Sequence, residues 1–317
     1  MSVKVRDFRS WFHQRNGKAA PPLQVPQAPP PVAKESHAPS FPLGVSFDER
    51  GFQIMLVRKD CTMTHVGGLY HDDLGGAIRA ALDAQGISER RAVFGLPAAA
   101  GLISSRDFPV LFTFRECMVN VATGPDDPRF DGVSPADLAV VLSLDPKKKD
   151  KASLRHGKYA VAHKAQVEEY RGIANAAGLR LEALDYEGFA WKRALHGVAD
   201  AVLSLSPSTA TLVVFTPDLF HCSAFDRTRG ADWMDRVSET LRTLRVDSNS
   251  AIDPRTLALF SDERDKHTIE TLATNGRVRV VFWEVTDPVD KSLVKSPPWA
   301  LAYGLALRDA EAEAMFA

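Results

Sequence analysis

Apolar residues near the middle of the chain recur first at strand spacing and then at helix spacing. Residues 159–162 form the short apolar run that is typical of a buried strand. A helix is predicted over residues 164–177, because its apolar residues recur at steps of three and four and so share one face. These residues are Val167, Tyr170, Ala174 and Ala177. Gly178 follows at a position where a left-handed C-cap favours glycine. Residues 179–184 predict a second strand and residues 187–195 a second helix, which completes a module of an α/β protein.

The pattern before this module predicts three strands, a helix and two more strands. The strands are expected at residues 43–47, 52–57, 62–66, 92–96 and 102–108, and the helix at residues 74–84. The order β-β-β-α-β is the order in which an RNase H-like half-domain of the actin type begins. A helix at residues 114–121 and a strand at residues 138–144 follow, and the charged run at residues 147–151 is expected to be a solvated loop.

The pattern after the module repeats this order in outline. Strands are expected at residues 211–215, 220–225, 257–260 and 278–283, and helices at residues 233–244, 268–273 and 299–306. The prediction is therefore an α/β, actin-like fold of two RNase H-like halves, with mixed sheets flanked by helices. The first half is placed at residues 43–200, with a small inserted subdomain at about 111–185, and the second half at residues 201–317. The repeat is one of fold, since the halves share no convincing sequence identity.

Two N-terminal segments precede this body. Residues 1–18 place Val5, Phe8, Trp11 and Phe12 at helical spacing among basic residues. Such a segment is either a basic amphipathic helix that contacts a membrane surface or a partner, or a frayed terminus. Residues 19–42 contain eight prolines and predict a disordered linker.

Composition excludes several classes of protein. The net charge of −1 gives no support to nucleic-acid binding. Cys61, Cys117 and Cys222 are far apart and odd in number, so neither a disulfide framework nor a zinc motif is expected, and a reducing cytosol fits best. No apolar run approaches the roughly 20 residues of a membrane-spanning helix, and no signal peptide is recognised at the N-terminus.

The module at residues 159–190 also carries a resemblance to a known family. Tyr159-Ala160-Val161-Ala162, a helix, Ala176-Ala177-Gly178-Leu179, a strand and then Asp185-x-Glu187-x-Phe189-Ala190 are similar to the PilM-type pilus-assembly proteins, whose relatives include MshI and the cytoplasmic part of GspL. These are actin-like proteins on the cytoplasmic side of type IV pilus machines. The resemblance implies a cytoplasmic protein, peripheral to the inner membrane, that binds the cytoplasmic tail of a PilN-like protein.

The resemblance also implies where a nucleotide would bind. In actin-type ATPases a β-hairpin of each half lies against the phosphates, and an aspartate in each hairpin helps to hold Mg²⁺ through water. The family's first hairpin resembles Gly-Ile-Asp-Ile-Gly-x-x-x-x-Lys. In residues 44–53 of this chain, Ser46 replaces the aspartate, Asp48 the second glycine and Gln53 the lysine.

The second hairpin and the adenosine loop also depart from the family. The pattern Val-Asp-Ile-Gly-x-x-x-Thr is aligned with residues 213–220, where Val214, Thr216 and Phe220 replace the aspartate, the glycine and the threonine. The loop Leu-Ser-Gly-Gly is aligned with residues 260–263, so that Ser261 is kept and Asp262 and Glu263 replace the glycines.

Each departure disfavours the binding of ATP. Val214 cannot hold a metal-bound water, Pro217 lacks a backbone donor, Phe220 fills space meant for phosphate, and Asp262 and Glu263 bring negative charge. The prediction is a scaffold without catalytic activity, cofactor or metal, whose vestigial loops are the only candidate nucleotide residues. The alternatives are an active ATPase that binds ATP and Mg²⁺ through loops misaligned here, and an α/β enzyme related to sugar kinases.

Other chemistry finds little support in the sequence. The nine histidines form no metal-binding motif, and His163 is expected at a helix start. Asp185 and Glu187 lie two residues apart, where N-terminal capping of a helix is the ordinary explanation and an acid/base role a minor one. Asp48 and Asp218 are expected in turns.

Overall fold

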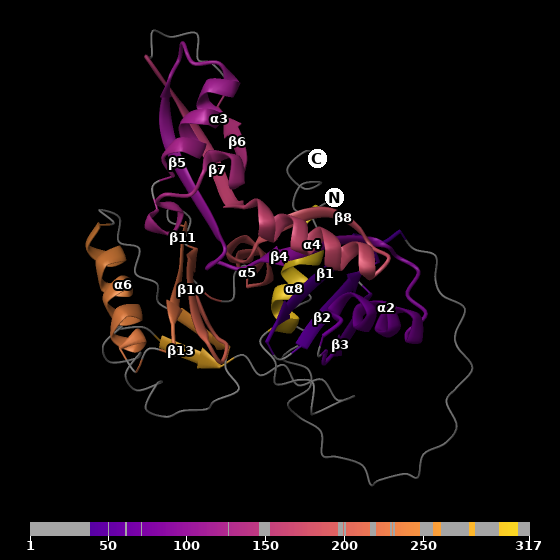
Figure 1. Ribbon diagram of the computed structural model, residues 1–317. Helices are drawn as coiled ribbons and strands as arrows, with labels where there is room; N and C mark the ends of the chain where they lie inside the picture. Colours follow the sequence, from indigo (N-terminus) through magenta and orange to yellow (C-terminus); the bar gives the residue numbers. More distant parts are fainter. Residues whose placement is uncertain are drawn as a thin grey trace, which may run out of the picture.

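Two five-stranded sheets of identical topology organise the molecule (Figure 1). The computed structural model describes residues 39–49, 51–60, 62–70, 72–125, 127–145, 153–195, 199, 201–215, 220–228, 230, 232–247, 256–260, 279–282 and 298–309. The first sheet contains β1 (Leu43–Asp48), β2 (Gly51–Val57), β3 (Met63–Gly68), β4 (Arg91–Leu96) and β8 (Arg180–Tyr186) in the order β3-β2-β1-β4-β8. The second contains β9 (Ala201–Leu205), β10 (Thr209–Phe215), β11 (Phe220–Asp226), β12 (Thr256–Phe260) and β13 (Arg279–Phe282) in the order β11-β10-β9-β12-β13.

The pairing directions agree as well as the order. In the first sheet β1 is antiparallel to β2 and parallel to β4, and in the second β9 is antiparallel to β10 and parallel to β12. The outer pairs match too, because β2–β3 and β10–β11 are antiparallel whereas β4–β8 and β12–β13 are parallel. Each half therefore has the RNase H-like topology, and the fold is actin-like, as predicted.

Helices cover the sheets in both halves. In the first half α2 (Leu74–Ala84) and α4 (Lys164–Ala176) pack on each other, and Ile78, Leu82, Tyr170 and Ala174 join the buried core of the sheet. In the second half Trp233, Val237 and Leu241 of α6 (Trp233–Asp247) cover β9 and β10. The helical spacing predicted for Tyr170 and Ala174 is confirmed, and Gly178 has the left-handed φ of 69° expected after the helix.

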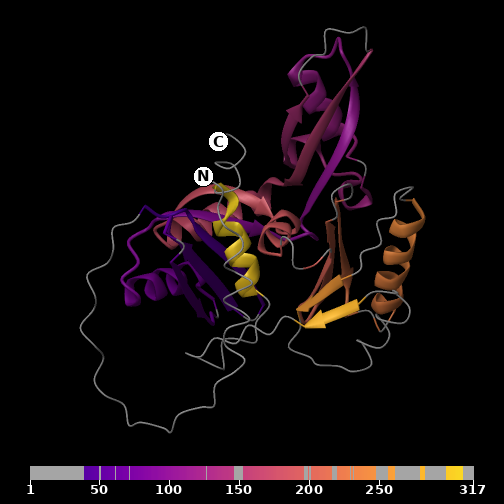
Figure 2. The same cartoon turned by 180° about the vertical axis from the view of Figure 1, so that it is seen from behind.

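A small three-stranded sheet projects from the first half (Figures 1 and 2). It contains β5 (Gly101–Pro109), β6 (Leu138–Leu144) and β7 (Leu154–His163) in the order β5-β7-β6, with α3 (Phe114–Thr123) on one face. Two short 3-10 turns, η1 (Pro128–Phe130) and η2 (Pro135–Asp137), lie between α3 and β6. The predicted boundaries of about 111–185 are wrong, because the inserted sheet occupies residues 101–163 and β8 belongs to the main sheet.

The last described helix of each half packs against the other in the space between the halves. α5 (Glu187–Ala194) ends the first half and α8 (Pro298–Ala306) ends the described part of the second, yet α8 packs on β1 and β2 as well as on α5. Trp191, Leu301 and Leu305 share a buried core with Val202 and Val213 of the second sheet. The two halves are therefore joined by continuous apolar packing.

Other predictions have mixed outcomes. The predicted N-terminal linker ends earlier than expected, because Phe41 donates a backbone hydrogen bond to Val57 (3.0 Å) and Lys59 donates one to Pro39 (2.9 Å). Strand β9 is missing from the prediction, in which the first strand of the second half began at residue 211. Residues 1–18, residues 19–38, the charged run at 147–151 and the predicted helix at 268–273 lie outside the described residues.

Candidate functional site

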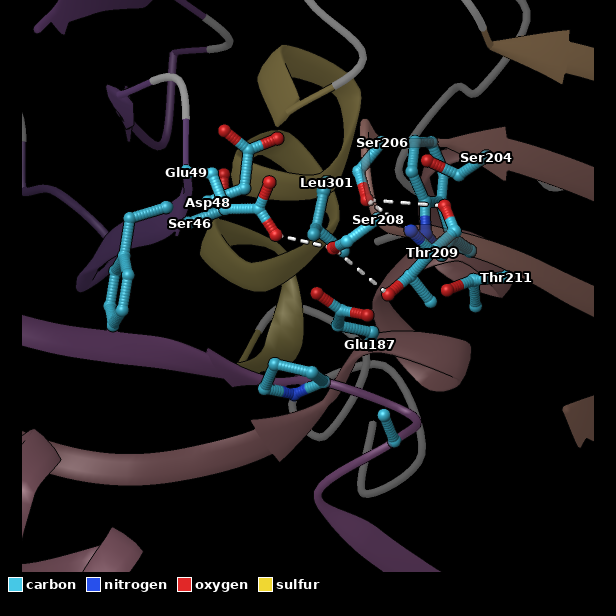
Figure 3. Close-up of a pocket in the computed structure, with 14 residues that line it drawn as sticks. Ser46, Asp48, Glu49, Glu187, Ser204, Ser206, Ser208, Thr209, Thr211 and Leu301 are labelled. Atoms are coloured by element: carbon cyan, nitrogen blue, oxygen red, sulfur yellow. Dashed lines mark hydrogen bonds between the residues drawn. The ribbon is translucent and has the colours of Figure 1, made fainter. Parts of the chain in front are cut away.

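A cavity of about 210 Å³ lies between the two halves (Figure 3). Its walls come from the end of β1, the start of α5, the loop after β4, the β9–β10 hairpin and α8. The lining residues are Ser46, Phe47, Asp48, Glu49, Pro97, Ala99, Glu187, Trp191, Ser204, Ser206, Ser208, Thr209, Thr211 and Leu301. A nucleotide of an actin-like protein would be expected at this place, where the first hairpins of the two halves face each other.

The first wall contains two of the residues predicted from the sequence. Ser46 and Asp48 lie at the carboxyl end of β1 and line the cavity together with Glu49 of the following turn. Gln53, the third predicted residue, is paired with Ser46 across the hairpin but does not line the cavity. Its side-chain oxygen instead lies 2.6 Å from His65 Nε2 on β3.

Glu187 brings a carboxyl group into the cavity from the first turn of α5. Burial raises the pKa of this carboxyl to about 7, the nearby charge of Asp48 adds to the increase, and a hydrogen bond from the Ala98 N–H opposes it. That N–H lies 3.4 Å from Glu187 Oε2, a long contact that compensates little of the lost hydration.

The second wall consists of hydroxyl groups that were not predicted as site residues from the sequence. Ser204, Ser206, Ser208, Thr209 and Thr211 line the cavity from β9, β10 and the turn between them. The sequence contained a signal for this hairpin, because Ser206-Pro207-Ser208 separates two apolar runs as a turn would.

The turn of this second hairpin uses its own donors. The Ser206 N–H donates to the Thr209 carbonyl oxygen (2.8 Å), and the Thr209 N–H donates to Ser206 Oγ (3.1 Å). Pro207 has no N–H. Ser208 Oγ donates a hydrogen bond across the cavity to the Glu49 carboxylate, which links the hairpins of the two halves (Figure 3).

The assignment of Val214, Thr216 and Phe220 to the second phosphate hairpin is wrong. By topology β9–β10 is the counterpart of β1–β2, whereas residues 213–220 belong to the next hairpin, β10–β11. Val214 is fully buried in the core under α6, and the backbone of Phe220 pairs with Phe215. Thr216 and the predicted adenosine loop, Ser261, Asp262 and Glu263, lie outside the described residues, as does Asp218.

The hairpin β9–β10 also departs from the family pattern. Aligned with residues 203–210, that pattern meets Ser204 in place of the aspartate and Ser206 in place of the glycine. The hairpin that the topology selects therefore also lacks the metal-binding carboxylate, although the residues responsible are not the ones first proposed.

Asp185 and Glu187 do not form a pair of carboxyl groups that could act together in acid/base catalysis. Asp185 is buried and bonds to Arg193, and both side chains are 9% exposed. Arg193 Nε also donates to the Gly304 carbonyl oxygen (2.8 Å), so this ion pair ties α5 to α8. The expected capping role is not found, because Tyr186 is the N-cap of α5 and no side chain caps this helix. His163 is the N-cap of α4, as predicted, and makes no capping hydrogen bond.

The charge of the cavity limits the ligands that it can hold. Asp48, Glu49 and Glu187 supply three carboxyl groups, and none of the described lining residues is lysine or arginine. Within the described part of the chain no group of three or more His, Cys, Asp or Glu residues is placed to hold a metal ion. The cavity is also smaller than the 300–1,000 Å³ or so of ordinary ligand pockets. An anionic polyphosphate is therefore a poor match for this site.

Two further features of the described residues concern cysteines and membrane spans. Cys117 and Cys222 are free thiols, and Cys61 lies outside the described residues. Where the chain is described, no helix is both long enough and apolar enough to cross a bilayer.

Comparison with known proteins supports the fold. Neither a family model nor a curated protein matches the chain. Among solved structures, a chain of the "PilM-PilN type IV pilus biogenesis complex" is similar at a TM-score of 0.61 and 14% identity, over 84% of this chain and 98% of that one. A protein of unknown function with an actin-like ATPase fold from Bacteroides thetaiotaomicron (12% identity, 83% and 95% covered) and the ethanolamine utilization protein EutJ from Carboxydothermus hydrogenoformans (11% identity, 89% and 92% covered) both score 0.46.

Proposed function

We propose that this chain is a non-catalytic, actin-like scaffold of a type IV pilus or type II secretion-like machine. It binds the cytoplasmic tail of a PilN-like inner-membrane protein and works in the cytoplasm, peripheral to that membrane. The fold likeness to a chain of the PilM–PilN complex supports the choice of machine and partner, because it extends over 98% of that chain. The net charge of −1 gives no reason to add a nucleic-acid partner.

The absence of catalysis is inferred from the β9–β10 turn. A phosphate is bound by free backbone N–H groups and a nearby cation. In this turn two N–H groups donate hydrogen bonds within the turn itself, and Pro207 has no N–H. The Ser208 hydroxyl donates its hydrogen bond to the Glu49 carboxylate. The same observation supports the proposal that the protein has no nucleotide cofactor and no metal.

Partner binding is tested with synthetic peptides that correspond to the cytoplasmic N-terminal tails of PilN-like proteins. We expect saturable binding by fluorescence anisotropy, and no binding of a scrambled peptide of equal charge. If no tail of a PilN-like protein encoded by a neighbouring gene binds, the scaffold role in such a machine is contradicted.

Nucleotide binding is tested separately by thermal unfolding with and without Mg-ATP. A ligand present at 100 times its Kd adds about 2.7 kcal/mol to the free energy of unfolding. We expect no change in Tm with Mg-ATP, Mg-ADP or Mg²⁺ alone. A rise in Tm with Mg-ATP that Mg²⁺ alone does not produce would contradict the proposal.

An active actin-like ATPase is the second candidate, and Glu187 favours it. A carboxyl group with a pKa near 7 in a cavity between two domains has the properties of a general base. If this candidate is correct, the protein releases phosphate from ATP, and Glu187→Gln abolishes the release while Mg-ATP still binds. Absence of phosphate release from the wild type rejects it.

A further inference from the structure

Two walls of different chemistry face each other in the cavity between the halves (Figure 3). Asp48, Glu49 and Glu187 bring carboxyl groups from the first half, and hydroxyl groups of β9, β10 and their turn form the opposite wall. None of the described lining residues is lysine or arginine. The cavity therefore combines negative charge with hydrogen-bond acceptors, and its electric field attracts cations.

The Thr211 side chain is a buried polar group in this cavity. It is only 8% exposed, and it lines the cavity from β10. Within the described part of the chain, no group forms a hydrogen bond with its hydroxyl. Figure 3 shows this hydroxyl pointing into the cavity, toward the side on which Glu187 lies. A buried hydroxyl without a partner is costly, so it marks a place where another molecule completes the hydrogen bonding.

Ser204 places a second hydroxyl beside Thr211. The two residues are paired across β9 and β10, so their side chains project from the same face of the sheet. Ser204 too has no hydrogen-bond partner for its side chain where the chain is described. Ser206 and Ser208 differ, because their hydroxyls already donate hydrogen bonds to other residues. A ligand would therefore meet the Ser204 and Thr211 hydroxyls first on this wall.

Glu187 supplies an acceptor from the first half. Among the described residues its carboxyl group has a single hydrogen-bond donor, the Ala98 N–H at 3.4 Å. Burial raises the pKa of this carboxyl to about 7, and the charge of Asp48 adds to the increase. A cation placed beside Glu187 would favour its ionised form, because opposite charges attract. The cavity is therefore suited to a positively charged hydrogen-bond donor.

We propose that the cavity binds a small organic cation that carries a primary ammonium group. Such a group has three N–H donors and no acceptor, so it matches a site of carboxylate and hydroxyl oxygens. An ion pair with Glu187 and hydrogen bonds to Ser204 and Thr211 would replace the water that the cation loses on binding. The volume of about 210 Å³ is below that of ordinary ligand pockets and suits a short alkylammonium ion. The inference goes beyond the scaffold role and does not depend on it.

Two observations favour an organic cation over a metal ion. In the described part of the chain, no group of three or more His, Cys, Asp or Glu residues is placed to hold a metal. Hydroxyl groups make up the second wall, whereas Ca²⁺ and Mg²⁺ are bound mainly by carboxylate, carbonyl and water oxygens. The ammonium group has two sources, a free amine or the lysine side chain of another protein, and the test distinguishes them.

The test uses the full chain and isothermal titration calorimetry with putrescine, whose uncharged counterpart is 1,4-butanediol. We expect putrescine to bind saturably with a Kd of about 1 mM or tighter, and the diol and MgCl₂ not to bind. A short peptide with blocked ends and one lysine is titrated in parallel. Tighter binding of the peptide assigns the site to a protein side chain, and tighter binding of putrescine assigns it to a free amine.

Two variants test the residues that would hold the ammonium group. We expect Thr211→Val and Glu187→Gln each to weaken putrescine binding about tenfold, because each removes a hydrogen bond to a charged group. Thr64→Val on β3 and Glu168→Gln on α4 are the matched controls, since neither residue lines the cavity. Both controls should bind putrescine as the wild type does.

Hydrogen exchange of the wild type provides a measurement that does not depend on how a variant folds. We expect putrescine, but not 1,4-butanediol, to slow exchange in residues 203–211. The proposal would be overturned if neither putrescine nor the lysine peptide bound, or if Thr211→Val and Glu187→Gln both bound putrescine as tightly as the wild type. Displacement of putrescine by MgCl₂, but not by NaCl of equal ionic strength, would assign the site to an inorganic cation and also overturn it.

Discussion

At the scale of single residues, Glu187 is a carboxyl group whose titration is shifted by its place in the cavity. Its pKa is raised from 4.5 to about 7, so between these values the folded protein binds more protons than the unfolded chain. The free energy of unfolding therefore falls as the pH rises from about 4.5 to about 7 and stays at the lower value above pH 7, and this group adds no slope with pH outside that window. The loss is at most about 3 kcal/mol, reduced by the water that reaches the cavity.

Replacing this carboxyl group should remove the fall in the free energy of unfolding between pH 4.5 and 7. We expect Glu187→Gln to raise the free energy of unfolding at pH 8 by about 1 to 3 kcal/mol and to flatten its slope between pH 5 and 7. Urea unfolding at several pH values measures both effects. Glu168→Gln is the control, because this glutamate is 63% exposed on α4. An unchanged slope in the Glu187 variant would show that the group titrates normally.

Asp185 should be structural, because its carboxylate neutralises the buried Arg193. Asp185→Asn leaves that guanidinium without a counter-charge, and we expect a loss of about 3 to 5 kcal/mol in unfolding experiments. Glu168→Gln breaks an exposed pair with Arg171 and should cost less than about 1 kcal/mol. Similar losses for the two variants would show that the Asp185–Arg193 pair is solvated.

At the scale of elements, the sequence predicted most strands and helices but not the hairpin that decides the site. Periodicity located α4, β8 and α5 because each is flanked by clear signals, such as Gly178 after α4. Strand β9 is five residues long and follows a helix closely, so its apolar residues did not stand out as a strand. Its omission shifted the second hairpin by one strand, and Val214 was assigned a role that belongs to the residues around Ser206. Contacts between distant segments, such as Glu49 with Ser208, have no local signal.

The crossing of α5 and α8 depends on a glycine. A Cβ atom added at Gly304 would lie 1.9 Å from the Ala190 carbonyl oxygen, so the helices would have to move apart. We expect Gly304→Ala to cost about 2 to 4 kcal/mol. Gly172 on α4 is the matched control, because an added Cβ meets nothing within 4 Å and alanine favours the helix by about 0.5 to 1 kcal/mol. Thermal unfolding should therefore shift Tm in opposite directions, and a stabilised Gly304→Ala would contradict the close crossing.

At the scale of the whole molecule, the two halves should unfold as one unit. Leu305 on α8 is fully buried in the core that also contains Val93 of the first sheet and Val202 of the second. Leu305→Ala should cost about 2 to 5 kcal/mol and speed hydrogen exchange in β4 and β9 together. Leu241→Ala removes an equally buried side chain from the core of the second half. It should therefore speed hydrogen exchange mainly in β9 and β10, and less in β4. If Leu305→Ala sped hydrogen exchange in one half only, the shared core would not couple the unfolding of the two halves.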